Sequence, residues 1–320
     1  MFLLDNYISQ IDSSVGYSHL SVARVVTALI CVVVFGGCGP RRDQTGRTEA
    51  VVGGDEAEFD DFSSLVAVSL AAENKHDDAQ FCGGTLIAPN WVLTAAHCLY
   101  NIDNTKFAPA DIDVRIPTST LNLDTKSFWR LPVKEIFSHQ GFNGYTYEND
   151  IALLQLDGRA PVNSQPLPLN SESTSRTFFE TATGLGQSSY LNSELPTELG
   201  SLAVVGWGVT ENGKASERAR DASVTHISTH TCHANYVQFG RTVTDDMICS
   251  HGELSNSGTT KADACSGDSG GPLILRRPDG KAELIGIVSW GEGCGQPGAP
   301  GVYTNITTYL LWIETHMAIG

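Results

Sequence analysis

Short stretches in which apolar residues alternate with small or polar residues recur along most of the chain. The four clearest cover residues 65–70, 84–88, 151–156 and 284–290. Clusters of Gly, Pro, Asn and Asp separate these stretches, which is typical of short strands joined by tight turns. Many short strands with such turns favour an antiparallel β-sandwich or β-barrel. We therefore expect an all-β protein.

The pattern changes near the C-terminus, where apolar residues recur at intervals of three and four. Ile306, Leu310, Ile313 and Met317 follow this spacing. A period near that of the α-helix predicts one amphipathic helix over residues 304–319. No other stretch has convincing helical character.

An apolar run over residues 25–37 follows Arg24 near the N-terminus. The run is shorter than a membrane-spanning helix needs, and it fits the core of a secretory signal. The segment before it is long and contains Asp5 and Asp12, so we expect the natural start of the protein to lie later than Met1. We interpret residues 1–38 as a leader and the polar, turn-rich residues 39–50 as a linker or short propeptide.

The leader ends in Phe35-Gly36-Gly37-Cys38, which resembles a bacterial lipobox, a motif whose cysteine carries lipid. Lipidation of Cys38 would anchor the protein to a membrane of the cell envelope. Ordinary signal cleavage nearby would instead release a secreted protein in which Cys38 is an incidental thiol. Both interpretations stay open at this stage.

Composition and charge narrow the classes of function. The chain has 320 residues, 41% of them hydrophobic, which is enough for one or two domains with a large core. Its formal net charge of −16 argues against a nucleic-acid partner, because such partners select basic surfaces. Six cysteines lie beyond the leader, and this number favours disulfides formed in an oxidising compartment.

Three separate motifs carry candidate chemistry. Ser269 lies in Gly267-Asp268-Ser269-Gly270, where glycines allow a tight loop whose N–H groups converge on a developing negative charge. His97 lies in Thr94-Ala95-Ala96-His97-Cys98, and Asp150 lies in Asn149-Asp150-Ile151. The order His, Asp, Ser is one of the known chain orders for a nucleophile, its base and the carboxylate that orients the base.

Together these motifs resemble the trypsin/chymotrypsin family of serine peptidases, from Val51 to about Ile319. The resemblance implies two antiparallel six-stranded β-barrels with the active site between them and a C-terminal helix. It also implies that residues 51–320 form one peptidase domain, active as a monomer. Residues 171–200 depart from the family pattern, and we expect an inserted surface loop that is either inert or substrate-selecting.

The resemblance assigns catalytic roles to the three motif residues. Ser269 would be the nucleophile, His97 its general base, and Asp150 the carboxylate that holds the imidazole. The backbone N–H groups of Gly267 and Ser269 would form the oxyanion hole. The alternative is a catalytically inactive, peptidase-like binding protein, and the intact triad argues against it.

Asp263 stands six residues before Ser269, where trypsin-like members of the family carry the aspartate at the base of the primary pocket. A carboxylate there favours protein or peptide substrates with Arg or Lys at P1, the residue before the scissile bond. The resemblance assigns the pocket wall and the groups that pair with the substrate backbone to Gly291, Gly301, Ser289 and Trp290.

The family also implies how the domain is cross-linked and activated. Its disulfides would be Cys82–Cys98, Cys232–Cys249 and Cys265–Cys294. Val51-Val52-Gly53-Gly54 matches the mature start, and the new α-amino group of Val51 would pair with Asp268. The residue before Val51 is Ala50, not the usual Arg or Lys, so we expect a separate activating protease that accepts a small P1 residue.

One dense group of potential metal ligands comprises His226, His230, Cys232 and His233. His226 fits an alternating strand pattern and Cys232 is assigned to a disulfide, so we interpret the group as structural. The segment that would form the family's calcium loop, residues 114–129, lacks the pair of glutamates. We expect neither a metal nor another cofactor.

Overall fold

The computed structural model describes eight segments: residues 51, 54–73, 80–101, 103–122, 128–171, 200–209, 215–252 and 262–319. The expected leader, the linker and residues 172–199 of the expected inserted loop lie outside these segments. The described residues all belong to one compact unit, Thr48–Gly320. None of the described helices is both long and apolar enough to cross a membrane.

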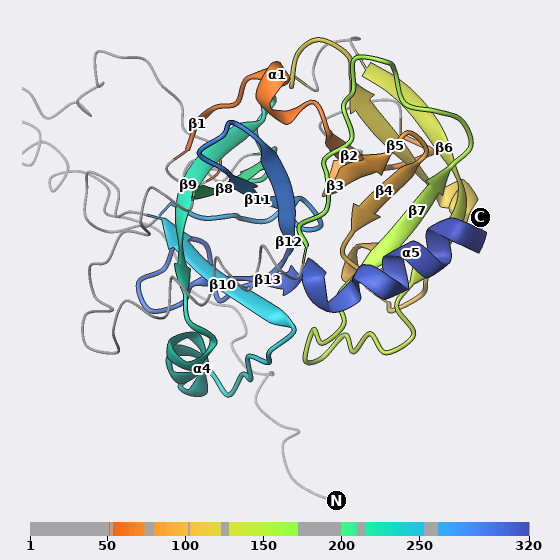
Figure 1. Ribbon diagram of the computed structural model, residues 1–320. Coiled ribbons are helices and arrows are strands. Elements are labelled where there is room, and N and C mark those ends of the chain that lie inside the picture. The colour runs from red at the N-terminus through yellow and green to blue at the C-terminus, as the bar shows by residue number, and fades with distance from the viewer. Residues whose placement is uncertain are drawn as a thin grey trace, which may run out of the picture. The chain divides into compact units, whose positions relative to one another are not determined.

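Six antiparallel strands close into a first barrel in the order β2-β3-β4-β7-β6-β5 (Figure 1). Their bounds are β2 (Leu65–Leu70), β3 (Gln80–Ala88), β4 (Trp91–Thr94), β5 (Ile112–Pro117), β6 (Phe128–Ser138) and β7 (Ala152–Leu156). The alternating stretch 65–70 is β2, and its first four residues are fully buried. Closure pairs every strand edge, which is how short strands avoid exposed backbone groups.

The second barrel follows the order β9-β10-β13-β12-β11-β8 and closes because β8 also pairs with β9. Its strands are β8 (Ser201–Gly206), β9 (Arg220–Ile227), β10 (Met247–Gly252), β11 (Pro272–Arg276), β12 (Ala282–Trp290) and β13 (Gly301–Asn305). A two-residue strand, β1 (Asp55–Glu56), adds to β9 outside the ring. The expected pair of six-stranded barrels is confirmed.

Helical structure in the described residues is short. It comprises α1 (Phe59–Phe62), α4 (Thr229–Val237), α5 (Leu310–Ile319) and the 3₁₀ turns η1 (His97–Leu99), η2 (Pro109–Asp111) and η4 (Ile306–Tyr309). The C-terminal helix begins later than predicted, because Thr304 and Asn305 end β13, where Thr304 pairs with Met247. Figure 1 shows α5 lying against the first barrel, where its Ile313 is buried.

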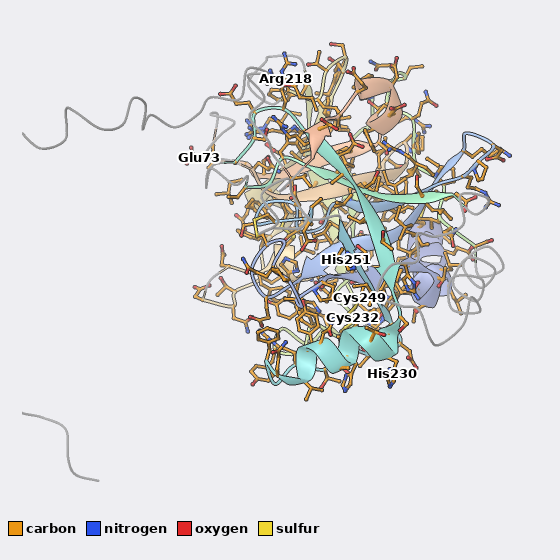
Figure 2. All side chains as sticks on the ribbon, turned by 90° about the vertical axis from the view of Figure 1, so that its left-hand side faces the viewer. Glu73, Arg218, His230, Cys232, Cys249 and His251 are labelled. Carbon is orange, nitrogen blue, oxygen red and sulfur yellow. A yellow bond between two sulfur atoms is a disulfide. The ribbon has the colours of Figure 1, made fainter. Side chains whose placement is uncertain are left out.

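Helix α4 was not predicted from the sequence. Its residues are mostly polar or β-branched and show no apolar period. Its start is stabilised locally by Ser228, whose hydroxyl accepts a hydrogen bond from the Thr231 N–H at 3.2 Å. A disulfide from Cys232 to Cys249 then ties the helix to β10 (Figure 2).

The three disulfides have the predicted pairing. Cys82–Cys98 joins β3 to η1, in the first barrel. Cys232–Cys249 and Cys265–Cys294 both lie in the second barrel. Each disulfide therefore cross-links one barrel internally.

Candidate active site

Strand pairing in the first barrel brings His97 and Asp150 together. β4 and β7 are antiparallel, with Thr94 opposite Ala152. His97 follows the end of β4 in η1, and Asp150 comes just before the start of β7. Residues 53 positions apart in the sequence therefore meet at one end of the barrel.

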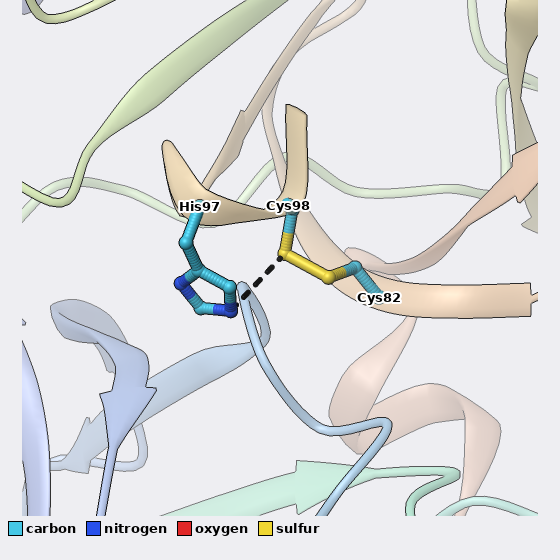
Figure 3. A group of neighbouring side chains, drawn as sticks. All are labelled: Cys82, His97 and Cys98. Carbon is cyan, nitrogen blue, oxygen red and sulfur yellow. Dashed lines mark hydrogen bonds between the residues drawn. A yellow bond between two sulfur atoms is a disulfide. The ribbon is translucent and has the colours of Figure 1, made fainter. Parts of the chain in front are cut away.

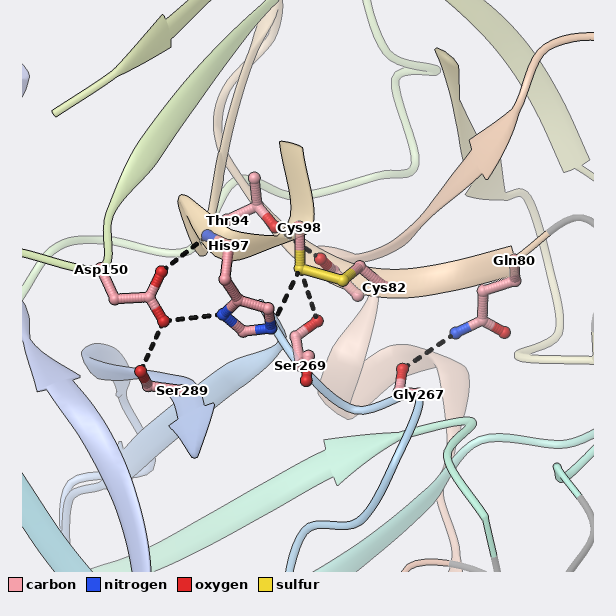
Figure 4. The surroundings of a disulfide bond; sticks show 10 residues. Gln80, Cys82, Thr94, His97, Cys98, Asp150, Gly267, Ser269 and Ser289 are labelled. Carbon is pink, nitrogen blue, oxygen red and sulfur yellow. Dashed lines mark hydrogen bonds and ion pairs between the residues drawn. A yellow bond between two sulfur atoms is a disulfide. The ribbon is translucent and has the colours of Figure 1, made fainter. Parts of the chain in front are cut away.

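The Asp150 carboxylate is fully buried and accepts three hydrogen bonds (Figure 4). Its Oδ2 lies 2.7 Å from His97 Nδ1, and its Oδ1 accepts the His97 backbone N–H at 2.8 Å. The Ser289 hydroxyl donates to Oδ2 at 2.5 Å. A carboxylate at Nδ1 fixes the tautomer with its proton there, so the lone pair of Nε2 is free to act as a base.

Two opposing effects act on the imidazole. Burial lowers the pKa of His97, whereas the negative charge of Asp150 and its hydrogen bond to Nδ1 raise it, and together these raise the pKa above its usual value. Asp150 therefore stabilises the imidazolium that forms when Nε2 takes a proton. A base whose charged form is stabilised in this way can take a proton and later return it.

Ser269 precedes β11 in the second barrel and lines the same cavity as His97. The cavity has a volume of about 330 Å³. The Ser269 carbonyl accepts the Gly83 N–H from the first barrel at 2.7 Å, so the serine backbone is fixed across the boundary between the barrels. Within the described residues the Ser269 hydroxyl makes no hydrogen bond to Nε2, and such bonds often tighten only when substrate binds.

The backbone N–H groups beside Ser269 fall into two classes, those with a carbonyl acceptor among the described residues and those without one. The N–H groups of Asp268, Gly270 and Gly271 all donate to carbonyls, at 3.0, 2.8 and 2.8 Å. Those of Gly267 and Ser269 donate to no other described residue. Gly267 has φ +99°, a conformation that favours glycine, and its carbonyl accepts the Gln80 side-chain N–H at 3.3 Å. Two neighbouring free donors suit a developing oxyanion.

Asp263 is buried and lines the same cavity. Its carboxylate accepts the N–H groups of Ala264 at 2.8 Å and of Gly295 at 3.2 Å. Burial raises the pKa of Asp263 to about 7, and those two N–H groups only partly oppose it. The described residues give it no cationic partner, so a cationic side chain entering the cavity would compensate its charge.

The remaining pocket residues predicted from the sequence line this cavity too: Ser289, Trp290, Gly291 and Gly301. A methyl group at Gly301 would lie 2.5 Å from the Asp263 carboxylate, which excludes any larger residue there without displacement. A methyl group at Gly291 would meet nothing closer than 3.6 Å. A glycine is therefore required at position 301 to leave room for the Asp263 side chain, whereas the glycine at position 291 only leaves space in the cavity.

Asp268 points away from the cavity chemistry into a tight backbone cradle. Its carboxylate is buried and accepts the N–H groups of Gly208 at 2.7 Å and Cys265 at 2.9 Å. A methyl group at Gly206 or Gly208 would overlap it. Burial raises the pKa of Asp268 to about 6. Val51 is fully buried in the core of the same barrel.

The described residues contain one close group of potential metal ligands, Cys82, His97 and Cys98, whose ligand atoms lie within 4.8 Å of one another (Figure 3). Both sulfurs are in a disulfide and offer no thiolate, so the group does not fit a metal site. In the group discussed from the sequence, Cys232 is also in a disulfide. Burial lowers the pKa of His226 to about 4.

Sequence reasoning missed several contributors. The Thr304 hydroxyl donates to the Asp150 carbonyl at 2.8 Å, and Gln80 reaches the loop at Gly267. Tyr147, with φ +59°, lines the cavity, and its ring centroid lies 5.7 Å from that of His97. No local pattern marks these residues, because each acts across a contact made only by the folded chain.

Comparisons with known proteins agree with this geometry. A family model described as Trypsin matches residues 51–313. The chain is 36% identical to bovine coagulation factor XII over 291 residues, which is 88% of this chain and 42% of that protein. It is 28% identical to trypsin Blo t 3 of Blomia tropicalis over 302 residues, 90% of this chain and 97% of that protein.

A third relative is human tissue-type plasminogen activator, 35% identical over 240 residues, which cover 74% of this chain and 39% of that protein. The chain thus spans about two fifths of the length of factor XII and the plasminogen activator. The region matched by the family model, residues 51–313, carries the two barrels.

Proposed function

The chain belongs to the trypsin family of serine peptidases, and on that premise we propose that it is a serine endopeptidase that cleaves proteins after Arg or Lys. The observation that carries the proposal is one cavity lined by His97, Ser269 and the buried Asp263, with Asp150 hydrogen-bonded to His97 behind it.

The proposed reaction is acyl transfer in two steps. Ser269 Oγ attacks the substrate carbonyl while His97 Nε2 takes its proton, and the N–H groups of Gly267 and Ser269 donate to the oxyanion. The imidazolium then gives the proton to the leaving amine. Water, deprotonated by His97, hydrolyses the acyl-enzyme and regenerates Ser269. Asp150 holds the imidazole through Nδ1 and stabilises the imidazolium.

The P1 preference is proposed from the charge of the cavity floor. Ionised Asp263 has only backbone donors, so a guanidinium or ammonium at P1 gains an ion pair in a dry pocket. An uncharged P1 residue leaves that carboxylate buried and unpaired, which gives strong discrimination. Ser289 and Trp290 would flank the substrate backbone beside this pocket.

The test uses mature enzyme with Val51 at its N-terminus and matched peptide amides with Arg, Lys, Phe or Ala at P1. We expect kcat/KM to be far higher for Arg and Lys, and Ser269→Ala to lower kcat by roughly five to six orders of magnitude. Asp263→Ser should remove the preference for Arg. Cleavage that survives Ser269→Ala would disprove the mechanism, and an intact Arg preference in Asp263→Ser would disprove the pocket assignment.

We further propose that the enzyme is exported and acts as a monomer without a cofactor. Three disulfides support an oxidising compartment. Membrane anchoring through Cys38 stays a proposal, since that residue lies outside the described residues. Partition of the wild-type protein into detergent, with release by Cys38→Ser, would support anchoring, whereas soluble protein without an acyl group on Cys38 would leave simple secretion.

A further inference from the structure

Asn149, the residue just before the catalytic aspartate, contacts residues that belong to the second barrel or follow its last strand. Asn149 has φ +56°, a left-handed conformation that is uncommon for residues other than glycine. Its backbone N–H lies 3.3 Å from Asp246 Oδ2, and its side-chain Oδ1 lies 3.1 Å from the Tyr309 hydroxyl. Its side-chain amide also donates to the Gly141 carbonyl at 3.0 Å, within its own loop.

Tyr309 and Asp246 form a pair of their own. The Tyr309 hydroxyl donates to Asp246 Oδ2 at 2.8 Å, and the tyrosine is 4% exposed. Burial and the neighbouring Asp246 raise the pKa of Tyr309, so it remains an O–H donor at neutral pH. Asp246 is itself fixed in the second barrel, because its carbonyl accepts the Asn305 N–H at 2.8 Å and its Oδ1 accepts the Thr244 hydroxyl.

These contacts reach the active site through one peptide unit. Asn149 leads directly into Asp150, whose carboxylate must meet both the N–H and Nδ1 of His97. Asp246 and Tyr309 contact neither His97 nor the cavity. Their hydrogen bonds to the loop that carries Asp150 are those they make to Asn149.

We propose that Tyr309 and Asp246 are positioning residues for the catalytic aspartate, holding Asn149 so that Asp150 stays in hydrogen-bonding reach of His97. The effect of this positioning on catalysis rests on the proposed function, whereas the positioning of Asp150 relative to His97 does not. Small displacements of catalytic groups have large effects on rate, so a pair outside the cavity can matter for catalysis.

A purely structural role is the competing explanation. Tyr309 packs in the first core, and its ring centroid lies 5.3 Å from that of His139, so its loss could simply destabilise the protein. The two roles differ in one measurable quantity. Only positioning changes the interaction between Asp150 and His97, and that interaction raises the pKa of His97.

The first experiment measures the pKa of His97 by NMR titration in Ser269→Ala protein, which requires no activity. The signal must be assigned to His97, because His139 also faces Tyr309 and has its pKa lowered by burial and by His316, with Asp246 opposing. We expect Tyr309→Phe and Asp246→Asn each to lower the midpoint for His97 by a few tenths to about one pH unit. An unchanged midpoint in both variants would overturn the proposal.

The matched control is Ser228→Ala, which removes the cap of α4 and lowers stability without touching the loop that ends at Asp150. It should leave the His97 midpoint unchanged; an equal shift would mean that general loosening is the cause. In an Asn149→Ala background, Tyr309→Phe should have no additional effect if Tyr309 acts through Asn149. An undiminished effect there would refute the proposed route.

Kinetics adds the catalytic consequence. With Ser269 intact, Tyr309→Phe should lower kcat about tenfold with little change in KM, and the acid limb of kcat/KM should move with the NMR midpoint. An inactive wild-type protein would disprove the proposed function while the titration still decides the positioning role. A shifted midpoint with unchanged kcat would refute the catalytic part alone.

Discussion

Burial of the Asp263 carboxyl makes the binding of a cationic ligand in the pocket depend on pH. A carboxyl with its pKa raised to about 7 is mostly neutral in mildly acidic solution and mostly ionised in mildly alkaline solution. A cationic ligand binds only the ionised form strongly, so its binding must drive off the proton below pH 7. The carboxylate proposed to select the P1 residue is thus also a titrating group.

We predict that a small amidinium inhibitor binds with an affinity that falls about tenfold for each pH unit below 7 and is constant above pH 8. Calorimetry in buffers of different ionisation enthalpy should detect the release of close to one proton at pH 6. Asp263→Asn serves as the control, with weak binding that does not depend on pH in this way. His97→Ala should keep the dependence, which separates Asp263 from the imidazole. Constant affinity of the wild-type enzyme from pH 5 to 8 would contradict the prediction.

Gly291 and Gly301 give a second prediction, because their surroundings differ. Gly291→Ala should fold normally, since its methyl group meets only ordinary contacts, yet it should narrow the cavity and lower kcat/KM for Arg at P1 more than for Ala at P1. Gly301→Ala should also disturb Asp263 itself, which its methyl group would overlap. Comparing thermal unfolding with kcat/KM for both variants tests this; equal losses for large and small P1 residues in Gly291→Ala would count against it.

Single residues of the site divide into those the sequence could identify and those it could not. His97, Asp150, Ser269 and Asp263 lie in short motifs whose residue types suggest the proposed chemistry, and His97, Ser269 and Asp263 line one cavity. Gln80 carries no such mark. It matters because of an approach across 187 positions of sequence, and only the folded chain creates that approach.

Among the elements, strands were more predictable than helices. The run of apolar residues over Leu65–Leu70 predicts β2, and the first five residues of that strand are all buried, so both of its faces are covered. α4 has no comparable signal, since only Cys232 and Tyr236 of its nine residues are buried and its start depends on a capping serine. The start of the C-terminal helix was predicted too early because a strand competes for Thr304 and Asn305.

The disulfide of α4 yields a prediction at the element scale. Replacing Cys232 and Cys249 by Ala should lower the free energy of unfolding by about 3 kcal/mol. The disulfide closes a loop with a sequence separation of 17, and without it the unfolded chain gains conformational entropy. The kcat should change little, since neither cysteine lines the cavity. Denaturant unfolding and kcat measure the two effects.

The Cys82–Cys98 disulfide is the informative comparison, because Cys98 Sγ lies 3.8 Å from His97 Nε2. Replacing both of its cysteines by Ala should lower stability and also kcat. An equal loss of kcat in the Cys232/Cys249 and Cys82/Cys98 variants would contradict the prediction that only the Cys82–Cys98 disulfide affects the active site.

On the scale of the whole molecule, the proposed activation requires the N-terminus of the domain to reach Asp268. That carboxylate is buried with backbone donors alone, and burial raises its pKa to about 6, so an α-amino group would find an unpaired charge there. The residue before Val51 is Ala50, which a pocket selective for Arg and Lys should not accept. We therefore propose that the protease that makes the cut differs in specificity from this one.

We predict that purified precursor does not activate itself and that an elastase-like enzyme activates it by cutting between Ala50 and Val51. Trypsin should cut after Arg47 and leave three residues ahead of Val51, without activity. Activity and N-terminal sequencing, followed for precursor alone and with each enzyme, give the answer. Rapid, concentration-dependent self-activation that exposes Val51 would show that the pocket or the processing site is misinterpreted.

The placement of the three disulfides has a consequence for how the protein fails. Each disulfide among the described residues lies inside one barrel, whereas His97 and Asp150 belong to the first barrel and Ser269 to the second. The halves of the catalytic apparatus are thus kept in register by non-covalent contacts and by the connecting chain. Under heat or denaturant we expect the contact between the two barrels to open first. The protein would then lose activity while both barrels remain folded, and it would regain activity once the contact forms again.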